Sequence, residues 1–469
     1  MRQIILNEWK SITRDRTIFF VVVLFLLSLG FVTYSNILKN RVQIESHHVA
    51  HNHIRSQWDN MEPTNPHGAA HFGTFAFKPV SILSSIDEGI NGVTGNVLQL
   101  EGHTQNELTY SEATQSLNIS KFGKLKPSLL LQMVIPLFLI FISFNAVSKE
   151  KENGRIRILL QQGISLKQLV LSKSLAYWVV GLLLLSFTIL VQFIFSAQNL
   201  DRDILLRLIL LFSAYSIYYF IIVSLSVYLS SRLNNQTGAL AGMVSVWIIW
   251  TILIPKLTGN FAEKVYPLPS RIDFVNAMRE DRSKGIDGHS PSNEREEELK
   301  KTILTKYEVD SLSQLPINFD GLVMQADEEY GNMVWDKHFG NNYNILLEQK
   351  KLQQLSGFLN PFSALQNLSM GSSGSDLYHH LAFLEDVETY RRGFIKELND
   401  KHAYGGSKTG EWDWKADQEF FRSIADYSYI SPSFDTIYQS YFFDFLWLWL
   451  WIGLVLGLIF FTKISDITI

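Results

Sequence analysis

Histidine is the residue type in this sequence whose chemistry and spacing suggest a specific ligand. Four histidines stand in the phrase HHVAHNH, as His47, His48, His51 and His53. Imidazole nitrogens three or four residues apart share one face of a helix, and they are common ligands of Zn and Cu. If the helix formed by the preceding apolar residues continues into this phrase, His51 shares a face with both His47 and His48. The sequence therefore predicts a candidate Zn or Cu site at these four residues.

A second interpretation of the histidines requires no metal. All 12 lie in two polar segments, residues 38–127 and 258–440. Histidine is scarce in membrane-spanning helices, so it collects in the polar parts of a membrane protein. The phrase NPHGAAHFG, which contains His67 and His71, also fits a structural turn whose imidazoles cap backbone groups. Both interpretations stay open at this stage.

Catalytic motifs are missing from the sequence. There is no H-E-x-x-H, and GSSGS from Gly371 departs from G-x-S-x-G. The nearest match to a phosphate-binding G-x-x-x-x-G-K-[ST] is GGSKTG, in which Ser407 stands where the glycine before the lysine belongs. We therefore expect that the chain is not an enzyme and that it holds no nucleotide of its own.

A basic segment between two apolar runs is the second distinctive stretch. Residues 148–173 read SKEKENGRIRILLQQGISLKQLVLSK and contain six Lys or Arg residues. Basic residues close to the ends of spanning helices favour the cytoplasmic side of a membrane. Glu150 and Glu152 precede the apolar residues around Leu160, and basic residues follow them. Acidic residues near the start of a helix and basic residues near its end stabilise the helix dipole. This pattern predicts an amphipathic helix at the membrane surface.

The composition is that of a membrane protein with polar insertions. Of 469 residues, 47% are hydrophobic and 18% are charged, and the formal net charge is -4. This small charge argues against nucleic acid as a partner. The chain has no cysteine, which excludes disulfides and thiolate metal ligands.

Six apolar runs are each long enough to cross a bilayer, which takes about 20 residues. We expect spans at residues 17–37, 128–147, 174–197, 208–230, 237–257 and 442–461. Before them, Met1 to Arg16 forms an amphipathic elbow with Ile4, Trp9 and Ile12 near one face. The predicted fold class is an all-α membrane protein with six transmembrane helices and two extracytoplasmic, mainly helical insertions.

The expected domain organisation follows from the alternation of apolar and polar segments. It comprises an elbow and first span (1–37), a first insertion (38–127), four spans with the basic loop 148–173 (128–257), a second insertion (258–440), and a sixth span with its tail (441–469). Six crossings place both termini on the cytoplasmic side.

The basic loop resembles the coupling loop of type-2 ABC permeases. The resemblance is carried by Glu152, Gly154, Leu159, Leu160, Gly163, Ile164, Ser165 and Lys173. The loop departs from the usual sequence pattern of this family at three positions: Arg155 replaces a common Thr, Gly163 replaces a common Pro, and Leu166 replaces a residue that is often basic.

Three longer phrases are more specific. NPHGAAHFGTFAFKP, IDEGINGVTGNVLQLEGH and FLNPFSALQNLSMGSSGSDLYHHLAFLEDVETYRR resemble one branch of type-2 permeases that carries large extracytoplasmic insertions of unknown function. The N-terminal NEWKSITRDR also resembles the start of type-2 permeases.

The resemblance implies the permease subunit of an ABC transporter in a bacterial inner membrane. ATP and Mg would then belong to a separate cytoplasmic ATPase, and a second permease chain, lipid and an extracytoplasmic protein are the other expected partners. The residues implied in coupling to the ATPase are Glu150, Glu152, Gly154, Arg157, Leu160, Gly163 and Ser165.

Two other functions remain as alternatives. A metal-handling exporter would use His47, His48, His51 and His53 for Zn or Cu. A membrane-anchored binding or sensor protein would use the spans only to display the insertions, and it would have no ATPase partner.

Overall fold

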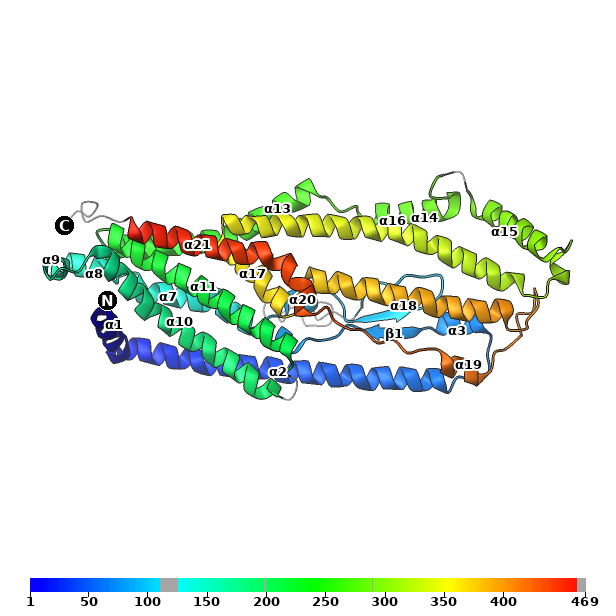
Figure 1. The fold of residues 1–469 in the computed structure, drawn as a ribbon, viewed down its shortest axis with the longest axis horizontal. Coiled ribbons are helices and arrows are strands. Elements are labelled where there is room, and N and C mark those ends of the chain that lie inside the picture. Colours follow the sequence, from blue (N-terminus) through cyan, green and yellow to red (C-terminus); the bar gives the residue numbers. More distant parts are fainter. Residues whose placement is uncertain (110–124, 198–199, 289, 462–469) are drawn as a thin grey trace.

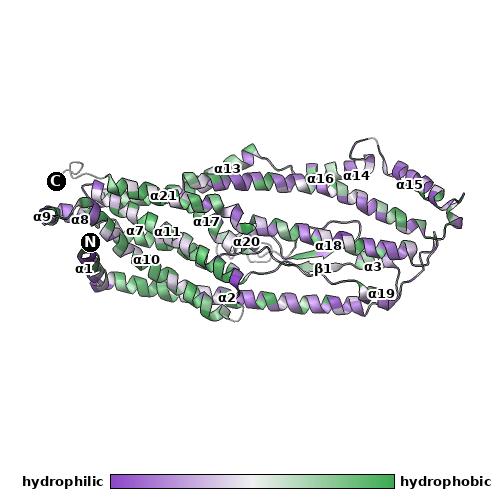
Figure 2. Cartoon of the chain, viewed as in Figure 1, coloured by the Kyte–Doolittle hydropathy of each residue, from purple (hydrophilic) through white to green (hydrophobic). Residues whose placement is uncertain are grey.

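The protein is elongated (Figure 1), with an apolar helical bundle at one end and a polar helical region at the other (Figure 2). This computed structural model describes residues 1–109, 125–197, 200–288 and 290–461. Residues 110–124 of the first predicted insertion lie outside this range. We call the polar region, residues 60–109, 266–288, 290–358 and 377–433, the distal domain.

The chain begins with the expected elbow, α1 (Arg2–Arg14), which buries Ile12 and half-buries Trp9. Asp15 ends it and caps the next helix by accepting from the backbone N–H groups of Thr17 and Ile18 at 2.9 and 3.3 Å. That helix, α2 (Arg16–Asp59), is continuous for 44 residues. The first span therefore extends as one helix from the bundle along the distal domain, and it includes the HHVAHNH phrase, which is the condition stated for the four histidines to share a helix.

Six helical segments within the described residues are long and apolar enough to cross a membrane, which confirms the predicted number. They are Arg16–Asp59, Pro127–Glu152, Leu166–Ser196, Arg202–Arg232, Gln236–Val265 and Phe434–Phe460. The elements that form the second to sixth are α6 (Pro127–Leu129), η3 (Leu130–Val134), α7 (Ile135–Ser143), α8 (Ser148–Glu152), α10 (Leu166–Ser196), α11 (Arg202–Arg232), α12 (Gln236–Ile248), η5 (Ile249–Leu253), α13 (Ile254–Val265), α20 (Phe434–Ile437), η8 (Tyr438–Tyr441) and α21 (Phe442–Phe460).

Two of the spans contain a wide π-turn two residues before a proline. The turn η3 precedes Pro136, which the sequence predicts as a kink, and η5 precedes Pro255. Proline lacks an N–H and its ring crowds the carbonyl one turn earlier, so the helix widens there. Neighbouring side chains bond carbonyls of these turns: the Tyr219 hydroxyl donates to Leu131 O at 2.8 Å, and Asn360 Nδ2 donates to Trp250 O at 2.7 Å. Side chains thereby bond carbonyls that the prolines leave without a backbone donor.

The first part of the distal domain contains the two described strands of the fold. A short helix, α3 (Pro66–Phe72), leads into β1 (Thr74–Phe77), which pairs antiparallel with β2 (Val97–Leu100) in the register Thr74 to Leu100. Two 3-10 turns, η1 (Ile82–Ser85) and η2 (Gly89–Gly92), lie between the strands. The sequence does not predict this hairpin, because each strand has only four residues and neither TFAF nor VLQL alternates apolar with polar residues.

The second part of the distal domain is helical, as predicted. Its long pair, α16 (Phe319–Leu355) and α18 (Leu377–Tyr404), runs antiparallel, and α18 lies between α16 and α2 (Figure 1). The shorter elements are α14 (Arg271–Lys284), α15 (Ser292–Tyr307), η6 (Leu312–Gln314), η7 (Ser356–Phe358) and α19 (Gln418–Ser423). Figure 2 shows the change from apolar helices in the bundle to polar surfaces in this region.

One helix of the second predicted insertion packs into the bundle. The helix α17 (Pro361–Ser372) is buried along almost its whole length against α11 and α21. Its Phe362 ring lies 6.3 Å from the ring of Tyr218 in the fourth span. Residues 258–440 are therefore not a separate insertion throughout, because the FLNPFSALQNLS phrase returns to the spans between α16 and α18.

Candidate functional site

The basic loop folds as two short helices, α8 (Ser148–Glu152) and α9 (Arg155–Gln161), which we call the α8–α9 hairpin. Gly154 joins the helices with φ 69°, and Gly163 follows the second with φ 84°. A Cβ at either position would meet nothing within 4 Å. Glycine is needed here for the left-handed backbone and not for space. Both glycines carried the family resemblance, including Gly163 in place of the usual proline.

The hairpin ends in a capping box that starts α10. Ser165 Oγ accepts from the backbone N–H of Gln168 at 3.3 Å, and the Gln168 side chain accepts from the backbone N–H of Ser165 at 3.1 Å. One turn further, the buried Lys173 ammonium contacts Glu150 of α8 and Glu8 of α1, both at 2.9 Å. Tyr177 also donates to Glu8, at 2.6 Å. One ion-pair network thus joins the elbow, the hairpin and the third span.

A second set of contacts ties the hairpin to the turn between α11 and α12. Ser230 Oγ accepts from the backbone N–H groups of Val147 and Ser148, both at 3.0 Å. Glu152 accepts from the backbone N–H of Gln236 at 2.9 Å. The Gln236 side chain also donates to Glu152. A displacement of the hairpin would therefore move α1, α10, α11 and α12 together.

The outer surface of the hairpin is basic and partly apolar. Ile156 is buried and Leu160 is half-buried against the bundle, while Arg157 and Ile158 are exposed. The predicted coupling residues lie together in this unit: Glu150, Glu152, Gly154, Arg157, Leu160, Gly163 and Ser165. Sequence reasoning missed Glu8, Ser230 and Gln236, because their partners are distant along the chain.

The four predicted metal ligands lie along α2 and face different neighbours. The His47 ring contacts Phe77 at 5.3 Å between centroids, and His51 Nε2 lies 3.2 Å from an Asp426 carboxylate oxygen. His48 and His53 are exposed. No group of three ligand atoms forms from these histidines among the described residues, so a metal site at this position stays a hypothesis.

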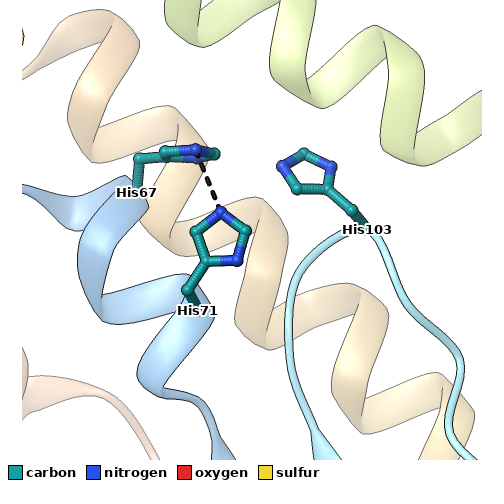
Figure 3. A group of neighbouring side chains, drawn as sticks. All are labelled: His67, His71 and His103. Atoms are coloured by element: carbon teal, nitrogen blue, oxygen red, sulfur yellow. Dashed lines mark hydrogen bonds between the residues drawn. The ribbon is translucent and has the colours of Figure 1, made fainter.

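A different group of histidines does come together. The described residues contain one set of at least three side chains with ligand atoms within 4.8 Å of one another, and it consists of His67, His71 and His103 (Figure 3). The Nε2 atoms of His67 and His71 are 3.2 Å apart. The sequence carried a signal for two of them: Asn65 followed by Pro66 is a helix-start pattern, and His67 and His71 are four residues apart.

The electrostatics of these three imidazoles differ. Burial, together with His71 and His103, lowers the pKa of His67 to about 4. A hydrogen bond with Glu328 raises the pKa of His103. Burial alone would raise the pKa of the Glu328 carboxyl, but His103 and the Arg391 guanidinium hold it below its ordinary value. His67 is therefore neutral near pH 7, and His103 is oriented by a carboxylate.

The fold defines a multi-pass helical membrane protein with a polar domain beyond the spans and a basic hairpin at the opposite end. Residues 70–262, which contain four of the spans and the hairpin, match the model of the ABC-2 family transporter protein. Residues 271–430 match a domain of unknown function, DUF3526. The chain is thus an ABC-2 type transporter protein with an additional domain, and this family implies an ATPase in the transporter. No curated protein matches the chain.

Proposed function

We propose that the chain is the permease subunit of an ABC transporter, in which ATP hydrolysis by a separate chain drives movement of, or mechanical work on, an extracytoplasmic or membrane substrate. The observation that carries this proposal is the α8–α9 hairpin. It presents exposed Arg157 and Ile158 at the end of the bundle, and it is tied to the spans through Lys173 and Ser230. Family membership supports the same assignment.

Force on the hairpin would reach the spans through short polar contacts. Closure of an ATPase pair on ATP would press on α9, and the Glu150–Lys173–Glu8 network would pass the displacement to α10 and α1. The Ser230 and Gln236 contacts would pass it to α11 and α12. The hairpin thus acts as the coupling helix of the transporter.

The orientation follows from the charge of the hairpin. By the positive-inside bias, the hairpin and both termini face the cytoplasm of a bacterial inner membrane. The distal domain is then extracytoplasmic, where it receives the substrate or holds an extracytoplasmic partner protein.

A second permease chain completes the transporter in this proposal, as a homodimer or a heterodimer. The most apolar window of α2 is only 17% buried, against 67% for the second span and 61% for the fourth. Lipid and a second chain would cover this exposed surface. A groove of about 610 Å³ between α1, α2 and α7, lined by Ile18, Phe25 and Phe138 among others, lies on the same side.

The test is to replace Ile158 with Glu. Ile158 is 56% exposed, so the variant should insert and fold normally, while a carboxylate desolvated at the ATPase contact weakens docking. We expect the ATPase that co-purifies with the wild-type chain in detergent to be lost by about tenfold or more, since an uncompensated interfacial charge costs about 2 kcal/mol or more.

The matched control is Ile272→Glu, the same change at a residue of the distal domain that is 73% exposed. It should leave co-purification unchanged. If no nucleotide-binding chain accompanies the wild-type protein, or if Ile158→Glu retains it fully, the permease assignment fails and a membrane-anchored binding or sensor protein becomes the better reading.

A further inference from the structure

The histidine group of the distal domain has the dimensions of a metal site. Three imidazoles converge on one space with ring centroids 4.6, 5.3 and 5.4 Å apart. In a tetrahedral zinc site with Zn–N bonds of about 2.0–2.1 Å, two ligand nitrogens lie about 3.3 Å apart. The Nε2 atoms of His67 and His71 are already 3.2 Å apart. Only one proton can lie between two such nitrogens, whereas a metal ion accepts both lone pairs.

The backbone holds the third ligand in place. Gly73 ends α3 with φ 64°, and a Cβ there would lie 2.2 Å from the carbonyl oxygen of Leu100, so only glycine allows α3 to approach the end of β2. Gly102 N–H then donates to Ala70 O at 2.9 Å. The next residue, His103, has a left-handed backbone with φ 62°, which is costly for a residue with a side chain. Such an outlier at a ligand position indicates a functional constraint.

The Glu328 carboxylate orients the imidazole of His103 by contacting the ring nitrogen that faces away from the other two histidines. His103 Nδ1 lies 2.9 Å from Glu328 Oε1, and its backbone N–H donates to the same carboxylate. Arg391, almost fully buried, contacts Glu328 at 3.3 Å and Glu388 at 2.8 Å. Histidine ligands of metals typically donate their second nitrogen to a carboxylate in this way. The contact leaves the Nε2 of His103 as its free ligand atom, on the side of the other two rings (Figure 3).

The site is open to solvent on one side. His71 is exposed and the other two histidines are half-buried. His103 and Glu328 also line a cleft of about 470 Å³ between α14, α16 and the loop after β2. An ion can therefore enter from solvent, and a fourth coordination position is accessible.

We propose that His67, His71 and His103 bind one Zn²⁺ ion, with Glu328 as the positioning residue behind His103. This inference goes beyond the permease function and does not depend on it. The ion would join α3 to the loop after β2, and the contact between His103 and Glu328 would connect this unit to α16. It places zinc at residues other than the four histidines of α2.

The test uses the full chain in detergent, stripped of metal with a chelator and then titrated with ZnCl₂. We expect one Zn²⁺ per chain, measured by elemental analysis after desalting and by competition with a chromophoric chelator. His71→Ala removes an exposed ligand, so the variant should fold, and we expect zinc binding at least ~100-fold weaker. Glu328→Gln keeps the shape of the side chain and should weaken binding about 10- to 100-fold.

The matched controls are His48→Ala and His53→Ala, two exposed histidines of α2, which should bind zinc as the wild type does. Co²⁺ provides an independent reading, because four-coordinate Co²⁺ has intense visible absorption bands that should be absent in His71→Ala. Circular dichroism and gel filtration verify folding of each variant. The proposal is overturned if the wild type retains no zinc, if His71→Ala binds zinc normally, or if a control variant abolishes binding.

Discussion

Lys173 in the bundle and Arg391 in the distal domain are both buried cations between two carboxylates, but the surroundings of the carboxylates differ. The side chains of Glu8 and Glu150 around Lys173 are 16% and 22% exposed. Those of Glu328 and Glu388 around Arg391 are 6% and 14% exposed. Each network joins elements that are far apart in the sequence.

The difference suggests different mechanical roles. Carboxylates near solvent can be rehydrated when their ion pair opens, so the Lys173 network can loosen at a modest cost, as the proposed coupling role of the α8–α9 hairpin would require. Carboxylates deep in the distal domain lose much more when unpaired, because little water replaces the guanidinium. The Arg391 network therefore suits a permanent support for the His103 loop.

The largest expected effect is that of Arg391→Met. It removes the cation that Glu328 and Glu388 share, while His103 still contacts Glu328 and Arg392 still contacts Glu388. We expect a loss of about 3–4 kcal/mol in the stability of the distal domain, because Glu328 keeps only a histidine partner in a buried position. The midpoint of thermal unfolding should fall, and amide hydrogen exchange should accelerate in α16 and α18 but not in α10 and α11.

The control for this change is Arg392→Met. Arg392 pairs with Asp336 and Glu388, but its side chain is 30% exposed and that of Asp336 is 61% exposed. We expect Arg392→Met to lower the stability of the distal domain by less than about 1 kcal/mol. If Arg391→Met and Arg392→Met lower the stability equally, burial of the ion pair does not determine how much it contributes to stability, and the comparison fails.

Lys173→Met should have a smaller effect. We expect it to lower the stability of the bundle by about 2–3 kcal/mol, a value between those for exposed and buried ion pairs. Tyr177 still donates to Glu8 in this variant, and solvent reaches both carboxylates. Hydrogen exchange should accelerate in α1 and α8, while the distal domain stays protected.

The exposed Lys167 provides the control, since Lys167→Met keeps the same segment and side-chain length. It should leave exchange in α1 unchanged. If Lys173→Met loosens the distal domain as much as the elbow, the two networks are not independent.

A third buried polar group predicts acid sensitivity of the distal domain. Lys78 Nζ donates to His380 Nδ1 at 3.1 Å, and burial together with the charge of Lys78 lowers the pKa of His380 to about 3. The unfolded chain binds this proton near pH 6.5 and the folded chain does not, so stability falls as the pH drops below 6.5. The expected slope is about 1.4 kcal/mol per pH unit between pH 6 and pH 4.

His380→Gln should reduce that slope in thermal unfolding measured over this pH range, because glutamine does not titrate. The difference between wild type and variant isolates His380 from other titrating groups. A variant with the same slope as the wild type would show that His380 is protonated in the folded protein.

Much of the bundle could be predicted from the sequence, because the length and hydropathy of the apolar runs are local properties. The pattern of the basic loop predicts one amphipathic helix, whereas the structure has two short helices separated by Gly154. Pro136 marks an irregular position in the second span, but the π-turn before it is visible only in the structure. The partners of Glu150 and Glu152 could not be predicted, because Lys173 and Gln236 meet them only after the helices pack.

The histidines show the same limit more strongly. The sequence predicts the metal site at the four closely spaced histidines of α2. Their side chains face Phe77, Asp426 and solvent instead of one another. His67 and His71 are a local pair, but His103 joins them only because the β1–β2 hairpin returns the chain to α3.

The sequence by itself therefore determined the number of spans, the basic loop and the family, since these depend on composition and on short patterns. Only the tertiary structure decided that α17 packs into the bundle, that Lys173 joins the elbow to the hairpin, and that His103 meets His67 and His71. Such contacts arise from the packing of whole elements against one another, and no local pattern of residues encodes which distant surfaces will meet.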